Sequence, residues 1–204
     1  MPKMYIISGC NGAGKTTASY TILPEMLECS QFINSDEFAK SFNPFKPEAA
    51  AIRASRFMLM KFHYLFDKRM DFGIETTLAT KILLKMAQRA QKEGYEVTIM
   101  YFWLRTPEMA VERVKARVAT GGHYIDEETI RRRYRMGLNY FFNEYIPFCD
   151  RWILLDNSTP PFHIVAQGRK GEEPEILDRT TYSVIREIAE KVADKVDDEQ
   201  GDGI

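Results

Sequence analysis

The sequence of 204 residues has few cysteines, no long hydrophobic segment and no excess of either charge. Its three cysteines, Cys10, Cys29 and Cys149, are odd in number and widely spaced, so they form neither a disulfide framework nor a metal-ligand pattern and indicate a reducing compartment. The longest apolar run, residues 98–104, is far too short to cross a bilayer, and we find no signal peptide. A net charge of -1 offers no broad surface for nucleic acid or a membrane. We therefore expect a cytoplasmic protein that binds neither nucleic acid nor a membrane.

The first motif along the chain is a glycine-rich turn between a predicted apolar strand, residues 3–8, and a helix. Gly9, Gly14, Lys15 and Thr16 fit the pattern G-x-x-x-x-G-K-[ST], in which backbone N–H groups surround the phosphates of a nucleotide. The lysine reaches the β- and γ-phosphates, and the threonine hydroxyl binds Mg²⁺. We expect ATP and Mg²⁺ as cofactors, bound by Gly9, Asn11, Gly12, Ala13, Gly14, Lys15, Thr16 and Thr17.

Asp36 follows a short predicted strand, residues 31–34. Open α/β sheets place active residues at the carboxyl ends of their strands, so we predict Asp36 as a general base. The structural alternative is that Ser35 or Asp36 is the N-cap of the next helix.

Glu75 lies at the carboxyl end of a second predicted strand, residues 71–77. It could orient an acceptor hydroxyl or hold the water shell of Mg²⁺. The alternative is that Thr76 and Thr77 cap the following helix and that Glu75 is only solvated.

Two arginine-rich helices, ending near residue 120 and beginning near residue 127, are separated by Gly121 and Gly122. Together, as residues 113–142, they resemble a mobile lid whose arginines bind phosphate oxygens. The alternative is a solvated basic face paired with glutamates. Helical periodicity places Arg133 beside the apolar face, points Arg131 and Arg135 outward, and leaves Arg132 undecided.

Two further segments have two interpretations each. The helix predicted over residues 48–69 is rich in Ala, Met and Phe; this stripe belongs to the core, or one side of it covers an acceptor. The strand 151–156 ends in Asp156, which is either a Mg²⁺ ligand or, with Asn157 and Ser158, a border of the adenine pocket. We include Asn157 among the predicted nucleotide-binding residues.

Strands that alternate with helices predict an α/β fold, a P-loop three-layer sandwich with a mostly parallel five-stranded sheet and a C-terminal hairpin or edge strand. With 45% hydrophobic and 12% aromatic residues, the composition is sufficient for one core. We expect one domain over residues 1–196 and a disordered acidic tail over residues 197–204.

These motifs, together with the segment Arg117–His123 and Arg133-Tyr134, resemble the zeta toxin family of P-loop kinases, in its compact bacterial branch. The resemblance implies that Lys15 binds phosphates, that Asp36 is the general base, and that Arg117 and Arg133 hold phosphates, with Arg113 competing for the first lid role. It also implies an antitoxin partner and, as acceptor, the amino-sugar hydroxyl of UDP-N-acetylglucosamine. His123 either touches phosphate or substrate, or bonds to the loop backbone.

The predicted function is therefore transfer of the γ-phosphoryl group of ATP to a hydroxyl of a small molecule, with Asp36, Lys15, Arg117, Arg133 and Glu75 as the catalytic set. A regulatory ATP-binding module and a nucleic-acid end kinase are the alternatives. The chain lacks the Asn-Lys-x-Asp sequence that reads guanine, which argues against a switch GTPase.

Overall fold

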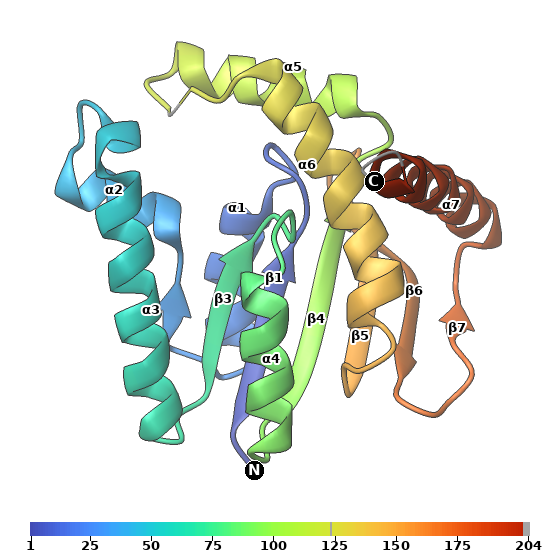
Figure 1. Ribbon diagram of the computed structural model, residues 1–204, viewed down its shortest axis with the longest axis horizontal. Helices are drawn as coiled ribbons and strands as arrows, with labels where there is room; N and C mark the ends of the chain where they lie inside the picture. The colour runs from blue at the N-terminus through green and yellow to red at the C-terminus, as the bar shows by residue number, and fades with distance from the viewer. Residues whose placement is uncertain (123, 202–204) are drawn as a thin grey trace.

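The computed structural model describes residues 1–122 and 124–201, and its centre is a seven-stranded sheet in the order β2-β3-β1-β4-β5-β6-β7 (Figure 1). The first five strands in this order are parallel, and β6 and β7 are antiparallel. The predicted five-stranded parallel sheet with a C-terminal hairpin is therefore confirmed. The strands are β1 (Lys3–Ser8), β2 (Phe32–Ile33), β3 (Phe72–Thr76), β4 (Glu96–Trp103), β5 (Arg151–Asp156), β6 (His163–Arg169) and β7 (Glu175–Ile176).

Strand β1 is the central strand of the parallel part. It pairs with β3 on one side and β4 on the other, and Met4 to Ile7 are buried. Its nearly continuous apolar sequence suits a strand covered on both faces. Because it ends at Ser8, the glycine-rich loop that follows lies at the carboxyl edge of the sheet.

The helices lie on both sides of this sheet and above its carboxyl edge. Figure 1 shows α4 and α6 in front of the sheet, α1 behind it, α5 across the top, and α2 with α3 at one side. The α-helices are α1 (Lys15–Thr21), α2 (Ser35–Phe42), α3 (Ala51–Asp67), α4 (Ile82–Lys92), α5 (Pro107–Ala119), α6 (Glu127–Tyr140) and α7 (Arg179–Gly201). None of the helices in the described ranges is long and apolar enough to cross a membrane.

Two α-helices are followed by π-helical turns. The sequence predicts a first helix over about residues 14–27 that is interrupted or ends near Pro24; α1 ends at Thr21, and the π-helical turn Ile22–Met26 follows it. Pro24 lacks the N–H group that a continued α-helix needs, and Leu27 instead donates to the carbonyl of Ile22. A second π-helical turn, Phe141–Tyr145, follows α6.

The remaining differences concern where helices begin and end. A 3₁₀ turn, Pro47–Ala50, precedes α3, so the α-helix begins later than the expected residue 48. Helix α7 begins at Arg179 and continues to Gly201, past the residue at which we expect the acidic tail to begin. Residues 202–204 of that tail lie outside the described residues, and the domain boundary stays a prediction.

Candidate active site

The loop between β1 and α1 has the conformation that phosphate binding requires. Gly9, Gly12 and Gly14 all have positive φ, as the predicted loop demands. At Gly14 there is also no space for a side chain, because a Cβ atom would lie 2.4 Å from Nδ2 of Asn157. Asn157 follows β5 and donates from Nδ2 to the carbonyl of Ala13 at 2.8 Å. It therefore supports the loop from outside, a contact that its position after a strand did not reveal.

Lys15, the first residue of α1, is 6% exposed and folds back over the loop. Its Nζ donates to the carbonyl of Cys10 at 3.0 Å and lies 3.7 Å from Oε1 of Glu75. Burial raises the pKa of the Cys10 thiol to about 11, although the ammonium of Lys15 acts in the opposite direction. The loop thus presents one cation, the Lys15 ammonium, beside a neutral thiol.

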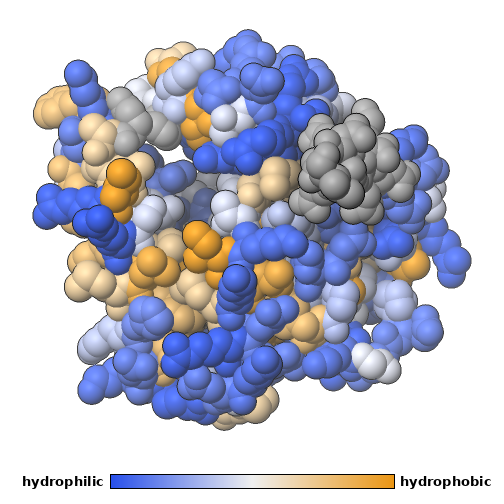
Figure 2. Space-filling model, in the orientation of Figure 1, coloured by the Kyte–Doolittle hydropathy of each residue, from blue (hydrophilic) through white to orange (hydrophobic). Residues whose placement is uncertain are grey.

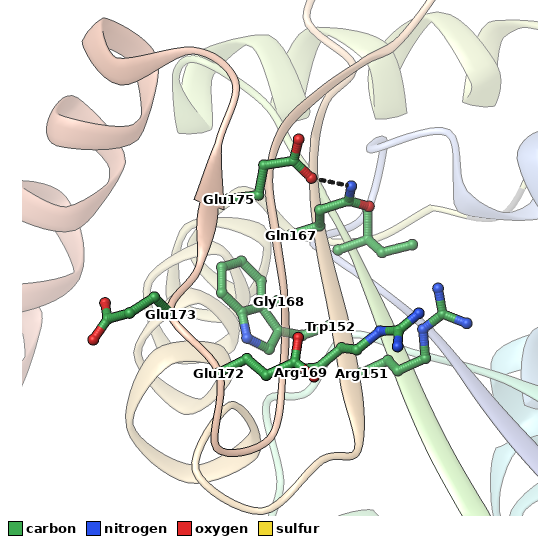
Figure 3. A pocket seen from close by; sticks show the side chains of 9 residues that line it. Arg151, Trp152, Gln167, Gly168, Arg169, Glu172, Glu173 and Glu175 are labelled. Carbon is green, nitrogen blue, oxygen red and sulfur yellow. Dashed lines mark hydrogen bonds between the residues drawn. The ribbon is translucent and has the colours of Figure 1, made fainter.

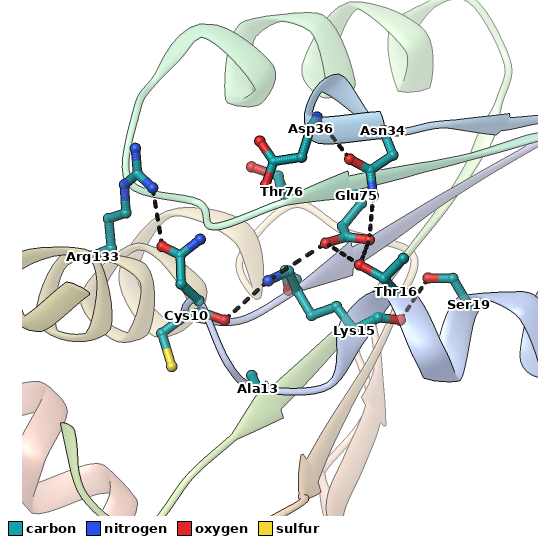
Figure 4. A network of polar contacts seen from close by, with 12 residues as sticks. Cys10, Ala13, Lys15, Thr16, Ser19, Asn34, Asp36, Glu75, Thr76 and Arg133 are labelled. Atoms are coloured by element: carbon teal, nitrogen blue, oxygen red, sulfur yellow. Dashed lines mark hydrogen bonds and ion pairs between the residues drawn. The ribbon is translucent and has the colours of Figure 1, made fainter. Parts of the chain in front are cut away.

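Glu75, at the end of β3, is the acceptor at the centre of a hydrogen-bond network (Figure 4). Its Oε2 accepts from the hydroxyl of Thr16 at 2.8 Å and from Nδ2 of Asn34 at 2.8 Å. Thr76 accepts from the N–H of Leu78, and neither Thr76 nor Thr77 caps α4, which begins at Ile82. The alternative that Glu75 is only solvated is therefore wrong.

Asn34 connects the two predicted acids. Its Oδ1 accepts from the N–H groups of Asp36 and Glu37 at 2.9 Å and 3.3 Å, so Asn34, and not Ser35 or Asp36, is the N-cap of α2. Asp36 is left with its carboxylate exposed beside the loop (Figure 4). The sequence signal for Asn34 was its place immediately before a helix; its bond to Glu75 had no signal.

The lid helices form one unit whose ends are determined by local chemistry. Thr106 caps α5, with Pro107 at the first helical position. At the other end Gly121 has φ of 87°, and Gly122 donates to the carbonyl of Arg117, as in a Schellman motif. Ion pairs join α5 to α6 through Lys115 with Glu127 and Arg131 with Glu108. His123, the candidate in this lid, lies outside the described residues.

The arginines of α6 lie in different environments. Arg133 is half-buried and donates from Nη1 to Oδ1 of Asn11 in the loop at 3.0 Å. Burial lowers the pKa of Arg133, and the nearby carboxylate of Asp36 partly opposes this shift. Arg132 is exposed and contacts Met136, while Arg135 is exposed. Arg133 is thus the α6 arginine that faces the loop, as the periodicity indicated.

The arginines of α5, in contrast, share one environment. Arg113 and Arg117 both line the space above the loop. Arg113 also donates from Nη2 to the carbonyl of Ser158 at 2.8 Å, so it connects α5 to the segment after β5.

Two hollows meet at this site. The first, here called the loop hollow, has a volume of about 330 Å³ and is lined by loop residues, including Thr16 and Thr17, together with Asp36 and Arg117. The second, the α3–α4 hollow, measures about 360 Å³ and lies between α3, α4 and the end of β3. The residues that line both are Asn11, Lys15, Asp36 and Glu75. A ligand in one hollow would therefore lie next to a ligand in the other.

Asp156, weighed as a Mg²⁺ ligand, takes no part in this convergence. It is buried, lines neither hollow and accepts from the N–H of Ser158 at 2.7 Å. A further hollow of about 200 Å³ is lined by Arg151 and Trp152 at the start of β5 and by Arg169 at the end of β6 (Figure 3). None of the sequence-predicted site residues lines it, so it is separate from the loop site.

Fold and loop together define the class: the chain has the architecture and the phosphate-binding loop of a P-loop kinase. The zeta toxin family model matches residues 1–141, and the chain belongs to this family. An uncharacterized protein of Haemophilus influenzae is 31% identical over 132 residues, which are 65% of this chain and 92% of that protein.

Solved structures of low sequence identity share the fold. The AvrRxo1-ORF1:AvrRxo1-ORF2 complex with ATP gives a TM-score of 0.71 at 14% identity, covering 91% of this chain and 63% of that chain. This protein thus spans less than two thirds of that relative's length. A chain of the PezAT toxin-antitoxin system of Streptococcus pneumoniae gives 0.59 at 16% identity, covering 94% and 87%. A putative kinase from Chloroflexus aurantiacus gives 0.51 at 18% identity, covering 64% and 78%.

Proposed function

We propose that this protein is an ATP-dependent kinase that transfers the γ-phosphoryl group to a hydroxyl of a small molecule. The observation that carries the proposal is the pair of adjoining hollows, which have Lys15, Asp36 and Glu75 in their common wall. ATP bound by the loop would direct its terminal phosphate toward a ligand in the α3–α4 hollow. In-line transfer needs such positioning and charge neutralisation more than covalent catalysis.

The residues around Thr16 fit a magnesium ion. The hydroxyl of Thr16 and the carboxylate of Glu75 are 2.8 Å apart, and both are hard oxygen donors. No group of three or more His, Cys, Asp or Glu side chains suited to a metal occurs among the residues described. A site with few protein ligands is typical of Mg²⁺, which keeps several waters and binds substrate phosphates. Bound there, the ion would neutralise phosphate charge.

The remaining roles follow from placement. Lys15 would neutralise the β- and γ-phosphates. Asp36 would accept the proton of the acceptor hydroxyl while the oxygen of that hydroxyl bonds to the γ-phosphorus. The bond from that phosphorus to the bridging oxygen breaks, and ADP leaves. Arg117 and Arg133 would stabilise the transferring group from the lid, and Arg113 is the alternative to Arg117.

Acceptor and partner are proposals with separate support. Family membership suggests a nucleotide sugar such as UDP-N-acetylglucosamine as one candidate acceptor, and it suggests an antitoxin as partner. The PezAT structure, described as a toxin-antitoxin system, supports the second point. A cytoplasmic location remains the prediction from the three free cysteines.

The Asp36→Asn variant tests the proposal. We expect transfer to fall by at least about 1,000-fold, because the base is lost, while ATP affinity stays within about twofold. The matched control is Glu37→Gln, which removes the neighbouring carboxylate that pairs with Lys40 and should retain activity. Transfer to a mixed pool of sugars, nucleosides and oligonucleotides is measured with labelled ATP. Full activity of Asp36→Asn would remove Asp36 from this role, and tight ATP binding without transfer would favour the regulatory module.

A further inference from the structure

Helix α6 has a glycine in its interior, where glycine is unfavourable unless a contact requires it. Gly137 is buried, and the helix continues beyond it to Tyr140. A glycine inside a helix weakens the helix, because glycine loses more conformational freedom on folding than alanine does. The backbone gives no reason for glycine here, since Gly137 is not among the glycines with positive φ. The reason lies in what packs against this position.

Gly137 packs against the main chain that follows β3. A Cβ atom at this position would lie 2.5 Å from the carbonyl oxygen of Thr77 and 3.2 Å from the hydroxyl of Tyr101. The first distance is shorter than the roughly 3.3 Å of close carbon–oxygen contacts, and a backbone carbonyl cannot turn aside as a side chain does. Thr77 lines the α3–α4 hollow, which Figure 2 shows with hydrophilic surface above it and hydrophobic surface below it. Gly137 thus lets α6 pack directly on the wall of this hollow.

A second contact anchors the same part of α6. The hydroxyl of Tyr134 donates to the carbonyl of Leu104 at 2.7 Å, and both residues are buried. Arg133 directly precedes Tyr134 and lies four residues, about one helical turn, before Gly137. From this place its guanidinium donates to Asn11 at 3.0 Å and lines the α3–α4 hollow (Figure 4). The two anchors therefore flank the turn of α6 that carries the arginine of the site.

From these contacts we infer that Gly137 and Tyr134 are positioning residues, which anchor α6 so that Arg133 is held above the phosphate-binding loop. The inference rests on the proposed kinase function, in which Arg133 stabilises the transferring phosphoryl group. An arginine that is in place before ATP binds needs no rearrangement when charge develops on that group. A methyl group on Gly137 would push α6 from the Thr77 carbonyl by about 0.8 Å, from 2.5 Å to an ordinary contact. A misplacement of about 1 Å can cost about 100-fold in rate.

The Gly137→Ala variant tests the first anchor. We expect kcat for phosphoryl transfer to fall at least about tenfold and KM for ATP to stay within about threefold, because the displaced arginine acts in the transition state. The matched control is Gly171→Ala, in the turn between β6 and β7. Gly171 has φ of 79° and a Cβ atom there meets nothing within 4 Å, so this variant strains the backbone far from the site and should keep its kcat. An unchanged kcat in Gly137→Ala would overturn the inference.

A double-mutant cycle with Arg133→Ala separates positioning from a general structural defect. If Gly137 acts through Arg133, the double variant should have the kcat of Arg133→Ala within about twofold. A general defect would multiply the two losses, and that product would contradict the inference. Tyr134→Phe tests the second anchor without adding an atom to a packed contact, and it decides the question if Gly137→Ala does not fold. We expect it to lower kcat at least about threefold in the unsubstituted protein, and by less than about twofold beside Arg133→Ala.

Failure of the proposed function gives a different result. A protein that binds ATP and transfers phosphate to no acceptor would overturn the kinase proposal, but the position of Arg133 can still be measured. We would determine crystal structures of the unsubstituted protein and of Gly137→Ala, or of Tyr134→Phe if the first variant does not fold. We expect the distance between Nη1 of Arg133 and Oδ1 of Asn11 to exceed about 3.5 Å in the variant, beyond hydrogen-bond range. An unchanged distance would contradict the inference.

Discussion

At the scale of single residues, the side-chain amide of Asn34 performs two tasks with its two ends. Its oxygen begins α2 by accepting from Asp36 and Glu37, and its nitrogen holds Glu75 at 2.8 Å. The residue is 5% exposed, so both bonds are shielded from water. Asn34 therefore fixes the relative position of the proposed base and the acid beside Thr16.

Replacing Asn34 by aspartate separates these tasks. Aspartate is an equally good N-cap, so α2 should persist, but it cannot donate to Glu75 and it places a second carboxylate there. Two adjacent carboxylates cannot both ionise easily, so the pKa of the pair rises. We expect the acid limb of the kcat/KM profile to move to higher pH and the neutral-pH rate to fall about tenfold.

Asn34→Ala is the comparison for the same position. It loses the cap as well as the donor, and we expect a loss of about 1 kcal/mol in the free energy of unfolding at every pH, whereas the loss in Asn34→Asp comes from carboxylate repulsion and disappears as the pH falls. Urea unfolding of both variants measures this difference. A pH–rate profile for Asn34→Asp identical to that of the unsubstituted protein would show that Asn34 does not position Glu75.

The lid arginines allow a second comparison at this scale. Arg133 donates to the loop through Asn11, whereas Arg132, its neighbour in sequence, is exposed. We expect Arg133→Ala to lower kcat by at least about 100-fold, because a cation beside the transferring phosphoryl is lost. Arg132→Ala should stay within about twofold. The ATP affinity of both variants is measured by calorimetry. Equal losses of kcat in the two variants would mean that α6 acts only through its overall charge.

At the scale of elements, the sequence predicted what depends on local chemistry. The bounds of β1 and β5 came from patterns within one segment. Helical periodicity also placed Arg133 toward the cleft, because each helical residue turns its side chain by about 100° from the last. The same argument could not choose between Arg113 and Arg117, which both line the loop hollow.

Contacts between strands could not be predicted in the same way. Asn34 and Glu75 are 41 residues apart and meet because β2 and β3 pair with Ile33 beside Ile74. That register depends on the whole sheet and has no signature in either segment. The support of the loop by Asn157 is likewise a contact across the sheet edge. The structure thus supplies the network that joins residues predicted one at a time.

The end of α5 offers a prediction at this scale. Gly121 has φ of 87°, and a Cβ atom there would meet nothing within 4 Å, so substitution tests the backbone alone. We expect Gly121→Ala to lower the free energy of unfolding by about 1 kcal/mol, because alanine is strained in the left-handed region. Gly121→Asn should cost less, since asparagine tolerates that conformation. Equal stabilities of the two variants in urea unfolding would argue against a role of the Schellman turn in stability.

At the scale of the molecule, one edge of the sheet gathers the site from distant parts of the chain. The loop follows β1, Asn34 and Asp36 follow β2, Glu75 is the last residue but one of β3, and Asn157 follows β5. Parallel strands force this convergence because their carboxyl ends lie on the same edge. The same packing buries Cys10, a residue of the loop, at 2% exposure.

This burial makes stability depend on pH in the alkaline range. Burial raises the pKa of Cys10 from its ordinary value of 9.0 to about 11, with Lys15 opposing the shift. Because the folded-state pKa is the higher one, the contribution to stability is complete below pH 9 and is lost as pH rises toward 11. Over that window the unfolded chain releases a proton that the folded protein keeps, which lowers the free energy of unfolding by about 1.4 kcal/mol per pH unit.

The Cys10→Ala variant isolates this thiol from other alkaline effects. Burial also raises the pKa of Tyr5, to about 12, but Tyr5 is present in both proteins and cancels in the comparison. With reductant present, we expect urea unfolding to give a decline between about pH 9 and about pH 11 that is shallower in Cys10→Ala by about one proton. Parallel declines would mean that the Cys10 thiol ionises in the folded loop at its ordinary pKa, with Lys15 stabilising the thiolate beside the phosphate-binding turn.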